Sequence, residues 1–417
     1  MSHNSNLIEI LSLLLFAVSF VNTLMVSKLE RLSSPFKIFS DVELVFGFWS
    51  IILLFLSVVV EGPHFPIRYL SSLNFQDVLF VFVIMNIATT KPVIEGAQLL
   101  ISKIVTLIPL SFEFSFFITI LAFAPLFGSL ITEPAAMAVC AVILRKSIFD
   151  KAISQNFKYA LLSLLFVNIS VGGTLTHFAA PPILIVARHW SISTPMLFSK
   201  LGYKSIIAIF LSTFCYLVLF RNELKHISID KKILIVRSTP IWTMVAHILL
   251  LFLSVFFAHS TISLIIIFLI FIAFFKISAR HHQSHLEIKE ALKVSFFLWG
   301  LIVIGGMQAW WLKKIIMNAT DNKLFFGATF LTAITDNAAL TYLGSVTGIE
   351  GELRWALLSG AVAGGGLTVI ANAPNPIGLS YLKDSFSQNG ISPIQILKWA
   401  ALPTIITIIC FIFLPNL

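Results

Sequence analysis

The sequence is divided by long apolar runs that contain no Lys, Arg, Asp or Glu. Five such runs cover residues 44–60, 205–220, 238–275, 294–312 and 399–417. A helix of about 20 apolar residues crosses the hydrocarbon core of a bilayer, where only helices and closed barrels satisfy their own backbone hydrogen bonds. The runs therefore predict an all-α polytopic membrane protein of about 10–12 spans. The run 238–275 fits two spans that turn near residues 259–261, and residues 7–27 predict a first span that is not a removed signal peptide.

The composition excludes several other classes of protein. Charged residues make up 11% of the 417-residue chain, against about 25% in soluble domains. A soluble globular enzyme and a disordered chain are therefore excluded. The three cysteines, Cys140, Cys215 and Cys410, lie inside apolar segments, which argues against a disulfide framework. The net charge of +9 comes mostly from short basic clusters between apolar runs, which is typical of loops facing anionic lipid and not of nucleic-acid binding.

Two charged clusters in the middle of the chain indicate its organisation. They cover residues 221–237 and 276–293, and a two-span hairpin between them would put both on one side of the membrane. The positive-inside rule makes that side cytoplasmic. We therefore expect a first transmembrane repeat at 1–220, a basic inter-repeat loop at 221–237 and a second repeat at 238–417.

Two short motifs occur twice in the same order. ITEPAA at 131–136 is matched by ITDNAA at 334–339, and GGTLTHFAAPPI at 172–183 is matched by GGGLTVIANAPNPI at 364–377. One short match is common by chance, but two in matched order indicate an internal repeat.

The repeated motifs predict two special elements in each half. Glycines and prolines lie in the middle of the long apolar segments 159–187 and 355–382 and should unwind each helix there. The segments 114–144 and 324–349 each contain a single acid and suit a re-entrant hairpin with that acid near its tip. Unwound backbone within a membrane is tolerated where protein or water surrounds it, and it often binds ions in transporters.

The two acids are Glu133 and Asp336, and a carboxylate within a membrane is a functional hypothesis by default. Na⁺ and Li⁺ are hard cations that prefer oxygen ligands. A low dielectric favours the protonated carboxyl group, so such a group can exchange a proton for a cation. Thr132, Thr335 and Asn337 adjoin the acids. The broken helices add further candidates for the ion site, namely Gly173, Thr174, Thr176, Gly365, Gly366, Thr368, Asn372 and Asn375.

The segments ITDNAALTYLGSV and GGGLTVIANAPNP resemble the signatures of a bacterial sodium/proton antiporter family. That family belongs to the ion transporter superfamily, which also holds dicarboxylate and arsenite-type carriers. The resemblance implies two inverted repeats that meet at a midplane site, with Na⁺ held at Asp336, Asn337 and Glu133. It also implies a multi-pass protein of the bacterial inner membrane and, because relatives are often dimers, a homodimer.

The hairpin tips differ from those of dicarboxylate symporters. Symporters of the superfamily carry Ser-Asn-Thr at both tips, whereas this chain has Thr132-Glu133-Pro134 and Thr335-Asp336-Asn337. Two acids would repel an anionic substrate and favour a cation. The Glu-Pro sequence of the first tip is less usual in the family than the Asp-Asn sequence of the second.

Three functions follow as hypotheses. The first is a secondary antiporter that exchanges Na⁺ or Li⁺ for H⁺ by alternating access, with no cofactor beyond the transported ions. The second is an anion or organic-acid carrier of the same superfamily. The third is an intramembrane hydrolase with a carboxylate pair, although no GxGD, GxSxG or HExxH motif lies in an apolar context. We therefore expect a transporter and not an enzyme.

Two other residues have alternative interpretations. His177 lies inside the first broken segment, and histidine changes charge near physiological pH, so it is either a pH sensor or a satisfied polar residue. Glu95 lies four residues after Lys91, which fits either a structural i,i+4 pair or a residue of the proton path.

Overall fold

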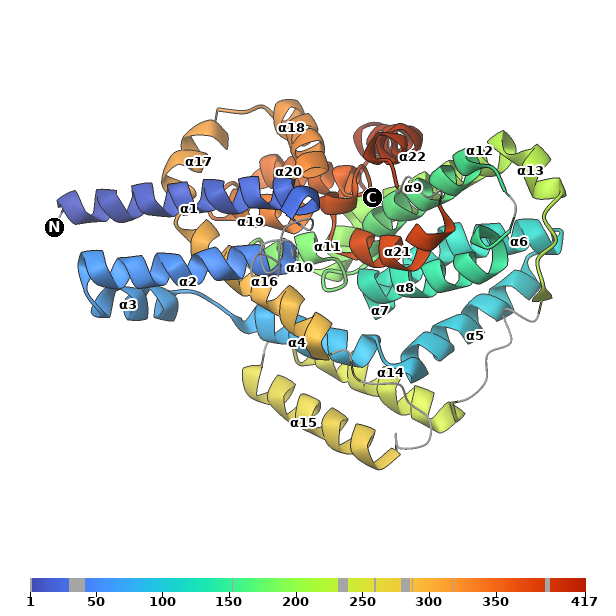
Figure 1. Ribbon diagram of the computed structural model, residues 1–417, viewed down its shortest axis with the longest axis horizontal. Coiled ribbons are helices and arrows are strands. Elements are labelled where there is room, and N and C mark those ends of the chain that lie inside the picture. The colour runs from blue at the N-terminus through green and yellow to red at the C-terminus, as the bar shows by residue number, and fades with distance from the viewer. Residues whose placement is uncertain are drawn as a thin grey trace.

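The described part of the chain consists of helices joined by short turns. The computed structural model describes residues 2–29, 42–151, 153–231, 239–258, 260–278, 286, 288–316, 318–386 and 391–417, and no strand occurs in these ranges (Figure 1). Residues 232–237 of the expected inter-repeat loop lie outside them, and its beginning forms the short helix α13, Arg221–Lys225. The all-α class is as the sequence predicts.

The helices are long and apolar enough for a multi-pass membrane protein. By length and composition five continuous helical segments suffice for spans, and two bent helix pairs raise the number to seven. Three shorter apolar helices, at residues 7–22, 241–256 and 261–276, lie beside them. The predicted pair in the run 238–275 is confirmed, because this run forms α14, Ile241–Phe256, and α15, Thr261–Ser278.

One candidate span is bent. The run 294–312 does not form a single helix, because α16, Ile288–Gly306, is bent by 78° from α17, Ala309–Ile316, although the two together are long and apolar enough for one broken span. Gly305 and Gly306 weaken the helix at this point. The absence of a side chain at Gly306 also leaves room for the Tyr69 hydroxyl, which lies 2.7 Å from where a Cβ would stand. That hydroxyl donates to the Val303 carbonyl at 2.6 Å.

The first half contains the predicted hairpin. Its first arm runs through α6, Phe112–Ile118, a π-helical turn and α7, Ala124–Ile131, and its second arm is α8, Glu133–Leu144. The two arms run side by side in opposite directions. A Cβ at Gly128 would lie 3.3 Å from the Ala136 Cβ, and the Cys140 thiol donates to the Ile120 carbonyl at 3.5 Å.

The predicted broken helices occur in both halves. In the first, α9, Gln155–Gly172, is followed by the 3-10 turn η4, Gly173–Leu175, a further turn over residues 176–180 and α10, Pro181–Ala187. In the second, α20, Gly351–Gly364, is followed by the 3-10 turn η8, Val369–Ala371, and α21, Pro374–Leu382. Each helix stops at the Gly-rich motif and resumes at a proline.

The second half repeats the acidic element as well. Helix α18, Asp321–Ile334, is followed by two extended residues, Thr335 and Asp336. Helix α19, Asn337–Ser345, begins directly after them. Within each half, the first arm of the hairpin packs on the first part of the broken helix: α7 contacts α9, and α18 contacts α20. Glycines permit both approaches, because a Cβ at Gly172 or at Gly364 would lie within 2.5 Å of the facing backbone carbonyl oxygen.

The second arm of each hairpin packs on the second part of the other half's broken helix. Helix α8 of the first half contacts α21 of the second, and α19 of the second half contacts α10 of the first. The two hairpins that carry the acids and the two broken helices therefore form one interleaved core. The matched contacts agree with an internal repeat, and the inversion of one repeat relative to the other stays a prediction.

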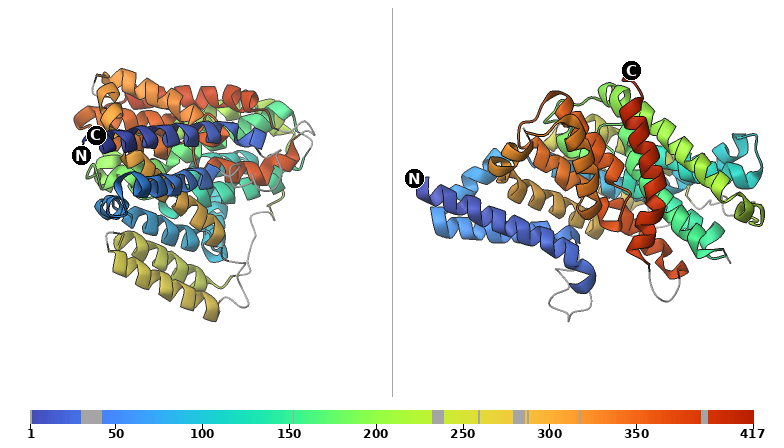
Figure 2. Two further views of the ribbon diagram at one scale, coloured as in Figure 1. Left: turned by 60° about the vertical axis from the view of Figure 1, so that its left-hand side comes forward. Right: turned by 90° about the horizontal axis from the view of Figure 1, so that it is seen from above.

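Other helices surround this core. On one side lie α1, Ser2–Leu29, α2, Val42–Glu61, α4, Gln76–Ala88, α14, α15 and α16 (Figure 2). Helices α2 and α4 both pack on α16, which also contacts α19. Helices α12, Tyr203–Leu219, and α22, Pro393–Phe413, cover α9 on the other side. The short helices α3, His64–Ser72, and α11, Thr194–Leu197, and the longer α5, Lys91–Leu107, complete the shell.

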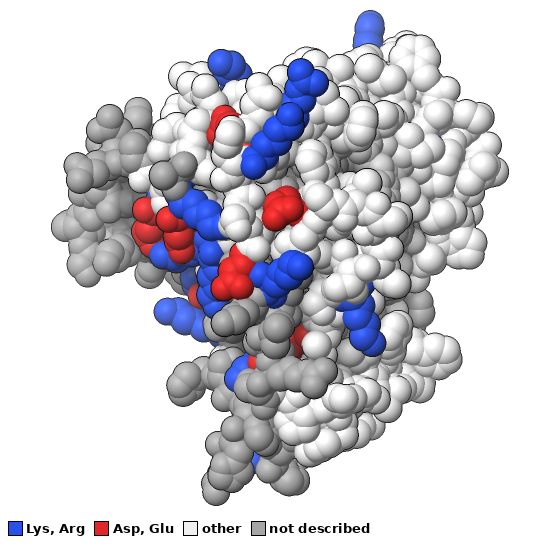
Figure 3. All heavy atoms as spheres, turned by 90° about the vertical axis from the view of Figure 1, so that its right-hand side faces the viewer, with Lys and Arg blue, Asp and Glu red and all other residues white. Residues whose placement is uncertain are grey.

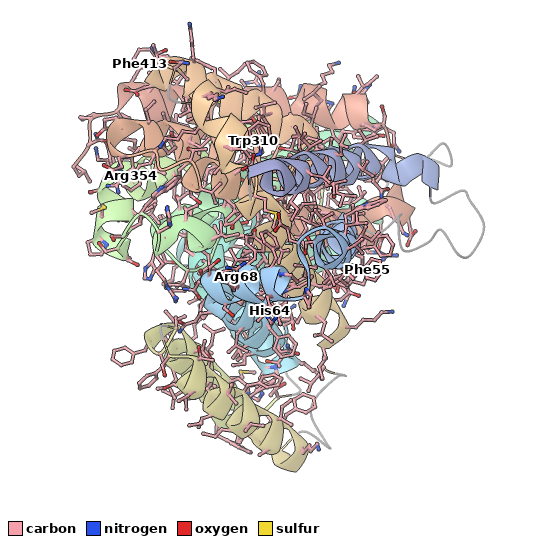
Figure 4. All side chains as sticks on the ribbon, turned by 90° about the vertical axis from the view of Figure 1, so that its left-hand side faces the viewer. Phe55, His64, Arg68, Trp310, Arg354 and Phe413 are labelled. Carbon is pink, nitrogen blue, oxygen red and sulfur yellow. The ribbon has the colours of Figure 1, made fainter. Side chains whose placement is uncertain are left out.

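Charged side chains gather at one end of the helices (Figure 3). Arg145 after α8 pairs there with Asp150 at 4.0 Å and Asp384 at 3.5 Å. The opposite end, seen in Figure 4, carries His64 and Arg68 of α3, Trp310 of α17, Arg354 of α20 and Phe413 of α22. These two groups of residues therefore lie at opposite ends of the helical bundle.

Candidate functional site

Both predicted acids lie at helix N-termini in the interleaved core. Asp336 is the N-cap of α19, and one oxygen of its carboxylate accepts the backbone N–H groups of Ala338 and Ala339 at 2.8 and 3.0 Å. Glu133 is the first residue of α8 and is fully buried. The positive end of each helix dipole faces a carboxylate, which favours the negatively charged form of the group.

Glu133 has one satisfied and one unsatisfied oxygen. Its Oε2 accepts from Asn372 Nδ2 at 3.0 Å, and its Oε1 is buried without a hydrogen-bond partner in the described ranges. Gly173 of the first broken helix packs against the unsatisfied oxygen, and a Cβ there would lie 2.2 Å from it. A buried oxygen of this kind either carries a proton or is ready to accept a cation.

Asn372 places the two acids at one site. It lines a small pocket of about 50 Å³ together with Asp336, Val294 and Phe297. Its amide nitrogen reaches Glu133 across the two halves, and its amide oxygen is buried with no partner in the part of the chain that the structure describes. The acids of the two hairpins are therefore connected through one side chain of the second broken helix.

Asn337 lies where the two broken helices cross. Both of its amide atoms are buried without partners in the described residues. A Cβ at Gly365 would lie 2.8 Å from the Asn337 Nδ2 and 2.1 Å from the Ser170 Oγ. The amide oxygen is therefore available as a cation ligand next to Asp336.

The remaining candidates divide into two groups. Thr174 Oγ1 donates to Val171 O and can accept from the Ser205 hydroxyl, Thr176 donates to Ser129 O, and Thr368 donates to Ala333 O. Asn375 Nδ2 donates to the carbonyls of Gly365 and Thr368 at 2.8 and 2.9 Å. These groups satisfy the unwound backbone. The hydroxyls of Thr132 and Thr335 are buried without partners among the described residues, and they stay available at the hairpin tips.

The tip of the first hairpin is strained. Thr132 has φ 81° and ψ 148°, a conformation that β-branched residues rarely adopt. The following Glu133-Pro134 sequence starts α8 at once, and Pro134 fits the first turn because it needs no N–H partner there. The surrounding packing must hold this strained backbone in place, and strain of this kind is concentrated at functional sites.

His177 and Glu95 lie in other surroundings. The His177 Nδ1 is 2.7 Å from the Thr194 hydroxyl, and its ring lines a separate pocket that contains neither Glu133 nor Asp336. The predicted pair of Glu95 with Lys91 is confirmed at 3.8 Å, and Glu95 Oε2 also accepts the Thr239 backbone N–H at 3.0 Å.

Sequence reasoning missed two serines that shape the site. The Ser129 hydroxyl donates to the Gly172 carbonyl at 2.6 Å and accepts the Leu175 N–H at 2.9 Å. The Ser170 hydroxyl donates to the Val362 carbonyl at 2.9 Å and so joins the two broken helices. Neither serine lies in a distinctive motif, and their partners are far away in the sequence.

We expect Gly173→Ala to displace the Glu133 carboxylate and to cost less stability than a clash with backbone alone. The added methyl group would lie 2.2 Å from the Glu133 carboxylate, the end of a flexible side chain, and 2.8 Å from the Ala180 Cβ, which moves only with its backbone, so some stability is lost. Gly366→Ala is the matched control, because its methyl group would stand 2.3 Å from the Val167 Cα, in a backbone that cannot yield. The control should lose about 2 kcal/mol or more of stability. Thermal unfolding and ion exchange of the two variants should therefore separate, and equal loss of stability would contradict the expected contact.

Comparisons with known proteins add the following. Residues 7–414 match the sequence family described as "Putative Na+/H+ antiporter". No curated protein matches the chain. Among solved structures, the chain is similar to the YdaH transporter of Alcanivorax borkumensis, whose crystal structure is described as having an unusual topology. The identity is 12% and the TM-score 0.45, over 88% of this chain and 96% of that chain.

Proposed function

Since the chain belongs to this family of Na⁺/H⁺ antiporters, we propose that it exchanges Na⁺ or Li⁺ for H⁺ at one site that Glu133, Asp336 and Asn372 form. The family makes the chain a multi-pass membrane transporter of cations and protons, and we do not expect an enzyme. The carboxylates alternately hold protons and a cation, because a buried acid is stable when it is protonated or paired with a cation.

One observation carries the proposal. The Asn372 amide donates to Glu133, and the same side chain lines the pocket that Asp336 faces. Its amide oxygen, the unsatisfied Glu133 oxygen and the Asn337 oxygen give a set of hard ligands suited to Na⁺. Among the described residues, those that line this pocket include no amine or guanidinium group, which a carboxylate substrate would require.

The two acids have different parts in the proposed cycle. Asp336 is 9% exposed and lines two small pockets, whereas Glu133 is 0% exposed. A cation would therefore reach Asp336 first and displace its proton, and the Asn372 amide would adjust as Glu133 changes charge. A cation and a proton compete for the same oxygens, so lowering the pH should raise the Na⁺ concentration needed for half-maximal exchange.

We also propose how the site opens to each side in turn. The core formed by α7–α10 and α18–α21 would move against the helices α1, α2, α4 and α14–α16. Residues 1–220 and 238–417 would be inverted repeats, which the matched contacts of the four core elements support. The bacterial inner membrane, the homodimer and a pH-sensing role of His177 stay predictions.

The test is a pH-jump assay in proteoliposomes or everted vesicles with an internal pH dye. A pH gradient is set, and NaCl, LiCl, KCl or sodium succinate is added in turn. We expect Na⁺ and Li⁺ salts to collapse the gradient with either counter-anion, and K⁺ to do so far less. Accumulation of labelled succinate without a response to Na⁺ would instead establish an organic-acid carrier and contradict the proposal.

A further inference from the structure

An ion pair joins the moving core to the surrounding helices at the end of α10. The Nη2 atom of Arg188, directly after α10, lies 3.5 Å from Asp77 Oδ1 in the first turn of α4, and the other terminal nitrogen donates to Gln76 Oε1 at 3.0 Å. Gln76 in turn donates to the Ala258 carbonyl at 2.8 Å, after α14. The side chains of Arg188 and Asp77 are 31% and 17% exposed, so the pair is partly buried.

This ion pair separates two pockets. One, of about 350 Å³, is lined by His177, Phe178 and Ser193, and the other, of about 360 Å³, is lined by Tyr342 and Ser345 of α19. Asp77 and Arg188 line both pockets. Together the pockets form a divided vestibule above the α10–α19 contact.

The vestibule is lined by part of the segment that breaks the first helix. His177 and Phe178 belong to the turn between η4 and α10, and Ala180 at the end of this segment packs beside Gly173, as Glu133 does. The vestibule lies at the end of the molecule shown in Figure 4, because Arg354 donates to the Trp190 carbonyl at 2.9 Å, two residues after Arg188.

The opposite end of the core is fastened differently. There Arg145 after α8 pairs with Asp384 after α21 and donates to the Tyr381 carbonyl at 3.1 Å. Lys158 Nζ donates to the Ser385 carbonyl at 2.6 Å. These contacts join core elements to one another, whereas the Arg188–Asp77 pair joins the core to α4, against which it would have to move.

We infer that the Arg188–Asp77 ion pair is a gate, which holds α10 against α4 and controls access from the vestibule to the segment between η4 and α10. Breaking the pair would release the end of α10 from α4, against which the core would have to move. The inference rests on the proposed cation exchange for its purpose. Its geometry is tested without any measurement of exchange.

The test measures the reactivity of a cysteine placed behind the pair. Ala180→Cys is introduced into a chain whose three native cysteines are replaced by alanine, and the rate of labelling by a charged maleimide is measured on purified protein. Asp77→Asn and Arg188→Gln each break the pair and should raise the rate about three- to tenfold, as expected for a partly buried ion pair. The double variant Asp77→Arg with Arg188→Asp should restore the rate of the parent. Leu184→Cys, which lines the vestibule from α10, serves as the reporter if Ala180→Cys does not fold.

Two controls make the result specific. Glu352→Gln breaks a shorter pair with Lys200, at 2.9 Å, that does not involve α4, and it should leave the rate unchanged. Ser193→Cys at the mouth of the vestibule should be labelled equally in all variants. Unchanged labelling in both single variants, or failure of the double variant to restore it, would overturn the gate. Loss of Na⁺/H⁺ exchange alone would bear on the proposed function and not on the gate.

Discussion

Asp336→Asn is expected to abolish Na⁺-dependent proton movement, with a loss of at least about 100-fold. Asparagine has the same shape as aspartate and caps a helix equally well, so it should still accept the N–H groups of Ala338 and Ala339. The variant cannot release a proton or offer a negative charge to a cation. Since only the charge changes, expression and thermal unfolding should resemble those of the parent, while the pH-jump assay gives no response.

The matched control is Asp321→Asn. Asp321 is also an aspartate at the beginning of a second-half helix, but it is exposed at the start of α18. This control should exchange as the parent does. If Asp336→Asn retained full exchange, Asp336 would have only its capping role, and the proposed site would be wrong.

Glu133→Gln is expected to reduce exchange by about 100-fold and not to lower stability. Glutamine can keep the contact with Asn372, because its amide oxygen can accept from Asn372 Nδ2. It also replaces a buried group that is costly when charged. The temperature of thermal unfolding should therefore stay the same or rise. This combination of lost exchange and retained stability distinguishes a transport residue from a structural one.

Glu113→Gln provides the comparison for this substitution. Glu113 lies at the start of α6, in the same hairpin arm that leads to the first tip, and is partly exposed. It should show parental exchange. A Glu133→Gln variant that exchanged normally but unfolded at a lower temperature would assign Glu133 to packing.

The broken helices could be predicted from the sequence because glycine and proline act locally. Helix α9 ends at Gly172 and α10 begins at Pro181, and α20 ends at Gly364 and α21 begins at Pro374. The missing N–H of proline and the freedom of glycine fix these positions without any tertiary contact. The acids at the hairpin tips were predictable for a similar reason, since each is the single charge in a long apolar segment.

Contacts between distant segments could not be predicted in this way. Asn372 was one of several candidate ligands, and its hydrogen bond to Glu133 joins residues 239 positions apart. The bend after Gly306 was not predicted, because a run without charged residues indicates how long a helical segment is but not whether the helix changes direction within it. The Arg188–Asp77 pair was not predicted, because its two residues are far apart in the sequence and neither lies in a repeated motif.

The interleaved packing of the second arms has a consequence for how the protein is made. Helices α8 and α10 leave the ribosome long before α19 and α21, which are their contacts across the core. Until residues 337–382 are synthesised, the first acidic tip has neither Asn372 nor its neighbouring arm. The first half alone therefore cannot complete the proposed ion site, and the Glu133 carboxyl group is without its Asn372 partner until the second half has been inserted.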